Sequence, residues 1–197
     1  MFTGIIEQTG ILHAIEHTGS NLHFWVKSAL ADALQVDQSL SHNGVCLTVD
    51  QLGQGMHRVT AVKETLEKTN LGLWQPGTMI NLERCMPLNG RLDGHMVQGH
   101  VDCTATCTRI TDKNGSWEYD FHFDDRFASL VIEKGSVSLN GISLTIFNIK
   151  KDGFTVAIIP YTFEHTNMQQ LKTGDTVNLE FDVIGKYVNR ISQLQNS

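Results

Sequence analysis

The sequence predicts an all-β fold made of two similar small domains, each of them a β-sandwich or a β-barrel. Three observations support this expectation. Short runs rich in Val, Ile, Thr, Phe and Leu recur between turn signals. Motifs of the first half return in the second half at a constant offset. The chain has 197 residues, enough for one large domain or for two small ones with a modest core each.

The expected strands are short and are separated by segments that favour turns. They include residues 21–26, 45–50, 57–62, 79–83, 117–123, 137–139, 142–148, 154–159 and 176–182. Short helical patterns interrupt the strands at matching places, because apolar residues spaced i, i+3, i+4 begin at Leu30 and again at Phe127. A second short helix in each half is expected near 66–71 and 163–171.

The second half repeats the first half at an offset of 97 residues. NGVCLTV begins at Asn43 and NGISLTI at Asn140; ETLEKTN begins at 64 and YTFEHTN at 161; GTMINLE begins at 77 and GDTVNLE at 174. Three matches at one offset indicate a duplication, and so long a period favours two sibling domains over a solenoid. We expect domains at 1–90 and 91–183, divided near the turn-rich segment PLNGRLDG.

The last residues have no copy in the first half. Ile184, Val188, Ile191 and Leu194 recur at helical spacing, which predicts a helix over 184–197. A lone exposed helix of this length is marginal in water. Its apolar stripe is therefore expected to dock either on its own chain or on other subunits.

Charge and composition argue against some classes of protein, among them a β-barrel module that binds nucleic acid. The formal net charge is −6 and no cluster of Lys and Arg is visible, which is unlike a nucleic-acid-binding protein. No stretch approaches the roughly 20 apolar residues that span a bilayer, and the start MFTGIIEQTG lacks the pattern of a signal peptide. We expect a cytoplasmic protein that binds neither membrane nor nucleic acid, with its four cysteines as thiols.

The repeated strand motif carries the main clue to chemistry. Side chains alternate across a sheet, so Cys46 and Thr48 share one face of NGVCLTV, and Ser143 and Thr145 share the same face of NGISLTI. A single pair of this kind is typical of a solvated strand face. Two copies with the same chemistry favour a repeated surface for a small ligand.

Other chemistries remain alternatives at this point. A zinc site would use His95, His100, Cys103 and Cys107, but their spacing lacks a CxxC motif. A hydrolase triad would use Ser143, His100 and Asp182, but no GxSxG elbow is present. A Cys46–His100 nucleophile pair is a further hypothesis.

The two halves also differ at matching positions. Lys63 and Glu64 correspond to Pro160 and Tyr161, and Lys134 corresponds to an aspartate at position 37. Two pockets built on these residues would differ chemically. Such an asymmetric pair of sites suits a reaction in which two copies of one substrate have different roles.

The chain resembles the riboflavin synthase family over essentially its whole length. The motifs that carry the resemblance are MFTGII, NGVCLTV, KETLEKTNLG, DGHMVQGHVD, NGISLTI and IPYTFEHT. The resemblance implies two tandem six-stranded Greek-key β-barrels with short helices, and a C-terminal helix that helps to hold a homotrimer. It places the active site between the N-terminal barrel of one subunit and the C-terminal barrel of its neighbour.

The activity implied by the resemblance is a dismutation. Two molecules of 6,7-dimethyl-8-ribityllumazine give riboflavin and 5-amino-6-(D-ribitylamino)uracil by transfer of a four-carbon unit, without a metal or an organic cofactor. The partners implied are this lumazine, riboflavin and two further copies of the chain, and an association with lumazine synthase is left open. The alternative is a non-catalytic lumazine- or flavin-binding antenna protein of the same fold.

The resemblance also implies a set of site residues. The catalytic candidates are Cys46, Thr48, His100, Lys134 and Ser143. As a hypothesis, His100 with Ser143 and Thr145 moves protons at one ring, Cys46 and Thr48 act at the other, and Lys134 stabilises negative charge. The implied substrate contacts are Gly4, Ile5, Ile6, Cys46, Leu47, Thr48, Thr60, Ala61, Val62, Lys63, Glu64, Thr65, Gly99, His100, Val101, Lys134, Ser143, Leu144, Thr145, Ala157, Ile158, Ile159, Pro160, Tyr161 and Thr162.

Two positions depart from the family pattern. Asn140 stands where the family often has Asp, which would remove one candidate acid or base. Tyr161 stands where Glu is common, which would change the contacts to the ribityl chain in the second pocket.

Overall fold

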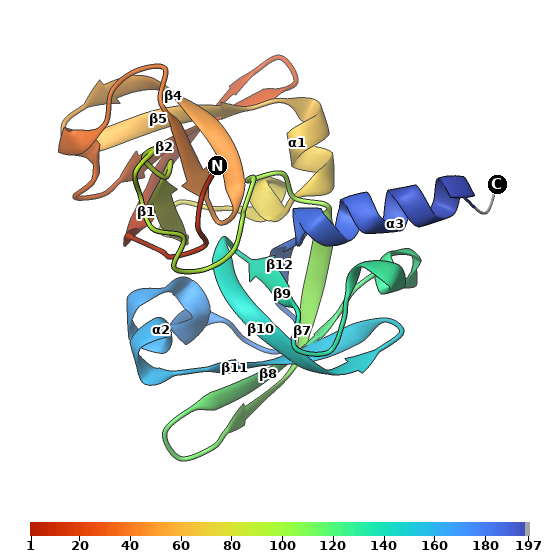
Figure 1. Cartoon of the computed structure of the whole chain (residues 1–197). Coiled ribbons are helices and arrows are strands. Elements are labelled where there is room, and N and C mark those ends of the chain that lie inside the picture. The colour runs from red at the N-terminus through yellow and green to blue at the C-terminus, as the bar shows by residue number, and fades with distance from the viewer. Residues whose placement is uncertain (196–197) are drawn as a thin grey trace.

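A computed structural model describes residues 1–195 and shows two closed, antiparallel six-stranded barrels, one above the other (Figure 1). The first barrel has the strand order β1-β2-β5-β4-β3-β6, and the second has the same order shifted by six strands. The strands are β1 Gln8–Thr18, β2 Asn21–Lys27, β3 Ser39–His42, β4 Val45–Gly53, β5 Met56–Ala61, β6 Met79–Arg84, β7 Cys103–Asp112, β8 Trp117–His122, β9 Ser136–Leu139, β10 Ile142–Lys150, β11 Gly153–Ile158 and β12 Thr176–Phe181. The all-β fold of two tandem six-stranded barrels is confirmed.

All nine expected strand segments fall on strands, but β1, β3 and β7 were not anticipated. β7 has the sequence CTATCTRITD, whose Thr and Cys residues hide its alternation of buried and exposed positions. β3 is SLSH, in which Ser41 and His42 are both buried although their side chains are polar. These strands face the core with small or polar residues, which an apolar pattern does not detect.

Alternation along the repeated motif builds both cores. In β4, Val45, Leu47 and Val49 are buried while Cys46 and Thr48 face outward, and β10 repeats this pattern. The first core differs from the second in holding a pair of buried histidines. His42 and His57 meet with their Nε2 atoms 2.8 Å apart, where the second barrel has leucine and phenylalanine.

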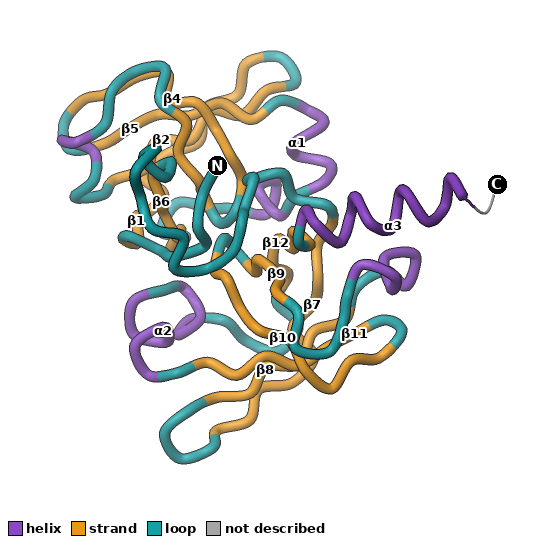
Figure 2. The backbone as a smooth tube through the Cα atoms, in the orientation of Figure 1, coloured by secondary structure: helices purple, strands orange, loops and turns teal. Residues whose placement is uncertain are grey.

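The expected short helices are present, but they are broken into single turns. Figure 2 shows them as brief purple segments between strands. They are η1 Ala31–Ala33, α1 Lys63–Lys68, η2 Asn70–Leu73, η3 Asp125–Leu130, α2 Pro160–His165 and η4 Asn167–Gln170. Thr69 ends α1 and caps η2, because its hydroxyl donates to the carbonyl of Thr65 and accepts from the amide of Leu71. Thr166 does the same in the second half, so the expected helices near 66–71 and 163–171 straddle a break.

The helix α3, Val183–Gln195, leaves the second barrel and projects from the body (Figure 1). The Lys186 ammonium lies 2.5 Å from the Asp102 carboxylate and ties the first turn to the body. Ile184, Val188 and Ile191 stay more than half exposed, so these three apolar side chains are largely accessible to solvent in the single chain. The expected helix extended to residue 197, and positions 196 and 197 lie outside the described residues. No helix within residues 1–195 is both long enough and apolar enough to span a membrane.

The two barrels meet around an internal pseudo-twofold axis that is lined by asparagines. Asn43 and Asn140 adopt a left-handed backbone conformation, with φ of 47° and 45°. Asn81 donates from Nδ2 to the carbonyl of Asn140, and Asn178 donates in the same way to the carbonyl of Asn43, at 3.0 and 2.9 Å. Asn140 is therefore part of a buried interface between the barrels and mirrors Asn43.

Candidate functional site

The first residues of the chain lie on the second barrel. The amide of Ser143 in β10 donates to the carbonyl of Gly4 at 2.8 Å, and the Glu83 carboxylate accepts from the amides of Thr3 and Gly4 at 2.6 and 3.0 Å. Gly4 has a φ of 78°, and a Cβ at this position would lie 2.6 Å from Ser143 Cβ. Only glycine permits both this conformation and this close approach.

The start of the second half lies, by the same geometry, on the first barrel. The amide of Cys46 in β4 donates to the carbonyl of Gly99 at 2.9 Å, and a Cβ on Gly99 would lie 2.6 Å from Cys46 Cβ. The Glu180 carboxylate accepts from the amides of Gln98, Gly99 and His100 at 2.7 to 2.9 Å. Each leading segment, 1–6 and 96–101, is thus held by a glutamate of its own barrel and lies against a strand of the other barrel. We call them the exchanged segments.

Burial raises the pKa values of the two carboxylates, Glu83 and Glu180, that hold these segments. Burial raises the pKa of Glu180 to about 7, although three amide donors and Lys186 favour its charged form. The pKa of Glu83 is raised by the same cause and lowered in part by its hydrogen bonds from Thr3 and Gly4. The resemblance to a family did not point to either glutamate, but both lie in the repeated GTMINLE and GDTVNLE motifs.

A pocket of about 220 Å³ opens on the outer face of the first barrel. Its walls come from β4, α1 and the exchanged segment. The lining residues are Val45, Cys46, Glu64, Thr65, Lys68, Thr69, Gly99, His100 and Val101. The structure therefore brings together the predicted contacts around Cys46, the start of α1 and the segment 99–101.

His100 lies with Cys46 rather than with Ser143. The expected grouping of His100 with Ser143 and Thr145 is not found within this chain, because segment 99–101 is hydrogen-bonded to β4 of the first barrel. Burial raises the pKa of the Cys46 thiol, and a hydrogen bond from Ser39 offsets part of this increase. The neutral thiol thus dominates near pH 7 and suits a hydrogen-bonding role better than a nucleophilic one.

Ser143 in the second barrel has a different histidine as its partner. Its hydroxyl lies 2.7 Å from Nδ1 of His95, whose Nε2 is buried without a hydrogen-bond partner in the described residues. Burial lowers the pKa of His95, and the nearby Asp182 carboxylate raises it in part. A neutral imidazole beside a hydroxyl can take up or release a proton. The sequence motif DGHMVQGH holds both histidines, and spacing alone did not distinguish them.

The zinc alternative is not supported by the positions of its cysteines. Cys103 and Cys107 are buried in the core of the second barrel, and burial raises their pKa values to about 12 and about 11. His95 is instead hydrogen-bonded to Ser143. Within residues 1–195, no three His, Cys, Asp or Glu side chains are grouped closely enough to hold a metal ion.

Several implied substrate contacts point their side chains into a barrel. Leu47, Ala61, Leu144 and Ile158 are buried core residues, so only their backbone groups can reach a ligand on the outer face. The segments 60–65 and 157–162 otherwise run equivalently, from the end of β5 into α1 and from the end of β11 into α2.

Lys134 and Tyr161, two positions at which the halves of the chain differ, have clear structural settings. Lys134 has a φ of 65°, and Asp37 at the matching place has a φ of 71°, so the two loops share one conformation with opposite charge. The Lys134 ammonium lies 5.1 Å from the ring centre of Phe147 on β10. Tyr161 is exposed and stacks on His165, with ring centres 4.1 Å apart.

Comparison with protein families agrees with this duplicated geometry. The model of the lumazine binding domain matches the chain twice, at residues 3–85 and 98–182, and both matches include an exchanged segment. The chain is thus a duplicated lumazine-binding-domain protein. Relatives that match over the full length identify the family within this class. Riboflavin synthase of Bacillus subtilis (strain 168) is 38% identical, and the match covers 100% of this chain and 92% of that protein. Riboflavin synthase of Mycobacterium tuberculosis (strain H37Rv) is 40% identical, covering 97% of this chain and 98% of its own. The chain belongs to the riboflavin synthase family.

Solved structures give the same fold. LumP complexed with riboflavin superposes with a TM-score of 0.86 at 21% identity, covering 92% of this chain and 99% of LumP. LumP complexed with 6,7-dimethyl-8-(1'-D-ribityl) lumazine gives 0.84 at 19% identity, with the same coverage. At this identity the likeness establishes the barrel pair alone.

Proposed function

We propose that the chain is a riboflavin synthase, a transferase that moves a four-carbon unit between two molecules of 6,7-dimethyl-8-ribityllumazine. The products are riboflavin and 5-amino-6-(D-ribitylamino)uracil. One observation carries the proposal. Each barrel presents a matched outer strand face, Cys46 with Thr48 and Ser143 with Thr145, and each face is bordered by a backbone segment from the other half of the chain.

Orientation supplies much of the rate in this account. The lumazine 7-methyl group is acidic because its carbanion is delocalised into the heterocycle, so a very strong base is unnecessary. Holding the two rings face to face in the reactive orientation contributes up to roughly 7–11 kcal/mol. Proton transfer through a positioned group adds about 10²- to 10⁴-fold.

The side chains have different tasks in the two sites. We assign proton transfer in the second site to the Ser143 hydroxyl, with the neutral His95 imidazole as its partner. In the first site, Cys46 and His100 from the pocket lining and Thr48 from the same outer face of β4 position a ring by hydrogen bonds. Lys134 supplies a positive charge on the outer side of β10, where it stabilises an anionic ring.

The proposed assembly is a homotrimer in the cytoplasm, in which a first-barrel site of one subunit faces a second-barrel site of its neighbour. Support comes from α3, whose apolar stripe of Ile184, Val188 and Ile191 is exposed in the single chain. Burying such a stripe between copies removes apolar surface from water, which stabilises an oligomer. The four free thiols suit a reducing compartment.

The test is turnover by the purified protein. Incubation with 6,7-dimethyl-8-ribityllumazine should produce one riboflavin for every two lumazines consumed. The absorbance of riboflavin monitors the reaction. Binding of lumazine without riboflavin formation would identify a ligand-binding protein of the same fold and refute the enzymatic proposal. A lack of binding would refute both functions.

A further inference from the structure

A row of polar side chains crosses three strands on the outer face of the first barrel. His23 in β2 lies opposite Thr60 in β5. On the other side of β5, Val49 in β4 pairs with Val59, and continuing this antiparallel register by one residue brings Thr48 beside Thr60. Thr48 and Thr60 are both proposed ligand contacts, so the row extends the first-barrel site toward β2.

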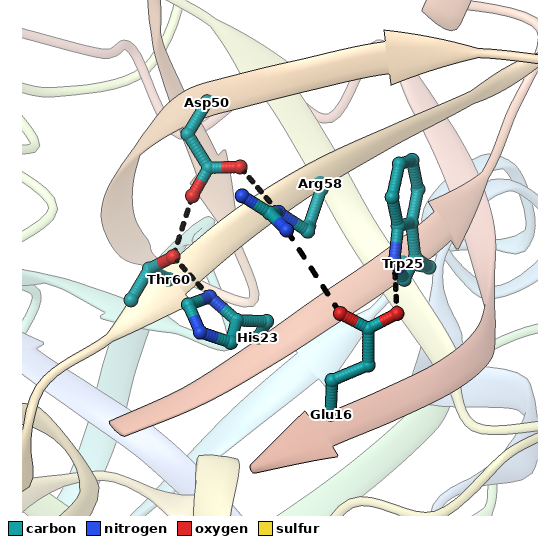
Figure 3. A network of polar contacts seen from close by, with 6 residues as sticks. All are labelled: Glu16, His23, Trp25, Asp50, Arg58 and Thr60. Carbon is teal, nitrogen blue, oxygen red and sulfur yellow. Dashed lines mark hydrogen bonds and ion pairs between the residues drawn. The ribbon is translucent and has the colours of Figure 1, made fainter. Parts of the chain in front are cut away.

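The hydrogen bonds of Thr60 have a fixed direction. Its hydroxyl contacts both the Asp50 carboxylate and the His23 ring (Figure 3). The hydroxyl oxygen lies 2.5 Å from Asp50 Oδ2 and 2.7 Å from His23 Nδ1. A carboxylate only accepts hydrogen bonds and a threonine hydroxyl has a single hydrogen, so that hydrogen goes to Asp50. His23 must then donate from Nδ1–H. One lone pair remains, and with it Thr60 can only accept a hydrogen bond from a ligand.

A second layer of contacts fixes Asp50. Arg58 Nε donates to Asp50 Oδ1 at 2.7 Å, and Arg58 Nη1 lies 3.8 Å from the Glu16 carboxylate. Trp25 Nε1 donates to Glu16 at 3.0 Å, and the Arg58 guanidinium lies 5.7 Å from the Trp25 ring centre (Figure 3). Because Asp50 is already held, little further order is lost when a ligand binds beside Thr60.

The second barrel has none of these groups at the matching places. Ala157 replaces Thr60, Phe147 replaces Asp50, and Glu118 lies opposite Ala157 where His23 lies opposite Thr60. Alanine offers no side-chain hydrogen bond. The two barrels therefore present different hydrogen-bonding groups to one and the same ligand.

We propose that His23 and Asp50 are positioning residues that make Thr60 a hydrogen-bond acceptor specific to the first-barrel site. The proposal rests on the proposed function, which supplies the ligand. The matching ligand group is a donor, and lumazine carries two kinds: the imide N–H of the ring and the hydroxyls of the ribityl chain. An acceptor in one barrel only gives the two bound lumazines different orientations or affinities.

The experiment measures lumazine affinity by fluorescence titration of the full chain, with two ligands expected per chain. T60V removes the acceptor and should weaken one of the two sites about tenfold, while T60S keeps the hydroxyl and should match the native protein. H23L removes the donor to Thr60 and should weaken the same site. H23N, whose amide nitrogen takes the place of Nδ1, should restore it.

Two analogues identify the donor. If the donor is the ring imide, methylation of that nitrogen should weaken lumazine binding at the first site of the native protein about tenfold. In T60V, the methylated and the unmethylated lumazine should bind this site equally well. If it is a ribityl hydroxyl, an 8-alkyl lumazine without hydroxyls should show this pattern. D120N is the matched control, because Asp120 accepts from Thr155 at 2.8 Å in the second barrel, away from the row.

Native affinity in T60V and H23L would overturn the proposal, and so would equal losses in H23L and H23N, which indicate a merely structural role. If the native protein binds two lumazines and the variants bind them with native affinity, the proposed enzymatic function stands and only this inference is refuted. A native chain that binds no lumazine would instead refute the proposed function.

Discussion

Ser143 and His95 show how one polar pair separates the chemistry of two similar barrels. The matching residue of Ser143 is Cys46, whose thiol faces an open pocket instead of a buried imidazole. A hydroxyl bonded to a neutral ring can pass a proton in either direction, whereas a neutral thiol with a raised pKa is a weak partner. We therefore expect the two sites to respond differently to the same substitution.

Replacing Ser143 by alanine should lower the single-turnover rate of riboflavin formation about 100-fold, because the proton path at the second site is lost. Lumazine affinity should change far less, since the barrel face remains. S143C places the first-barrel residue, cysteine, in the second barrel, and its single-turnover rate should lie between those of the native protein and S143A. An unchanged rate in S143A, measured by rapid-mixing absorbance, would remove the pair from the mechanism.

Gly4 carries a steric demand that a second glycine of similar conformation lacks. Gly4 and Gly55 have φ of 78° and 71°, but only Gly4 has a neighbour against its missing Cβ, whereas Gly55 faces open space. G55A should cost about 1 kcal/mol of unfolding free energy from backbone strain alone. G4A should cost at least twice as much, because the exchanged segment must also move away from Ser143.

Thermal or urea unfolding of the two variants provides the measurement. The comparison isolates packing, since both substitutions strain the backbone to a similar degree. Equal losses would contradict the close approach between Gly4 and β10. G4A should also weaken ligand binding at the second barrel, where Gly4 lies, although the glycine belongs to the first half of the sequence.

At the scale of the elements, α3 leaves an apolar stripe exposed in the single chain. One face carries Ile184, Val188 and Ile191, each more than half exposed, and the opposite face is polar. I191E places a charge in the apolar stripe and should shift the protein toward monomers, because an unpaired charge in an apolar interface is strongly unfavourable. Q193E places the same charge on the opposite face and should leave the oligomer unchanged.

Sedimentation velocity at micromolar concentration checks this prediction. A trimer in Q193E and a smaller species in I191E are expected, and the monomeric variant should lose turnover if sites are shared between subunits. Identical sedimentation of both variants would mean that the apolar stripe of α3 does not hold the assembly together.

The short helices and the unexpected strands show where element prediction from this sequence reaches its limit. Val45, Leu47 and Val49 have a clear alternating pattern, so β4 and its copy β10 were predictable. β7 buries small residues, Cys103, Ala105 and Cys107, and β3 buries the polar Ser41 and His42, so neither strand has the strongly apolar pattern that indicates an inward face. Helices α1 and α2 end at a threonine whose side chain competes for backbone groups, which periodicity does not reveal.

The candidate site was predictable as a set of residues but not as a grouping. The duplication indicated two faces, and Cys46, Thr48, Ser143 and Thr145 do lie on them. No local pattern indicated that Gly4 would lie on the second barrel or Gly99 on the first, because the exchange depends on how the barrels meet. The partner of Ser143 was missed for the same reason.

At the scale of the molecule, the two barrels should differ in their response to acid. The first core holds His42 and His57; burial lowers the pKa of His42 well below its usual range and that of His57 to about 4. The unfolded chain takes up protons near pH 6.5, where the folded core does not. Stability from this pair is therefore present above about pH 6.5 and is lost as the pH falls toward 4.

The double substitution H42L/H57F copies Leu139 and Phe154 of the second barrel and should remove this loss. Between pH 7 and pH 4 the native chain should lose about 3 kcal/mol more unfolding free energy than the variant, from the His57 shift alone. Burial raises the pKa of Glu180, so acid acts there in the opposite sense, but equally in both proteins. Urea unfolding across this pH range is the measurement, and parallel curves would contradict it.

The exchanged leading segments make the order of synthesis matter. Residues 1–6 leave the ribosome about 140 residues ahead of β10, the strand that they contact in the native fold. At common elongation rates this is a delay of roughly 7–28 seconds. During this interval the nascent first barrel also lacks the segment 96–101 that borders its own pocket. Neither half can form all of its native contacts alone. A bulky fusion at the amino terminus should therefore delay folding of the C-terminal half.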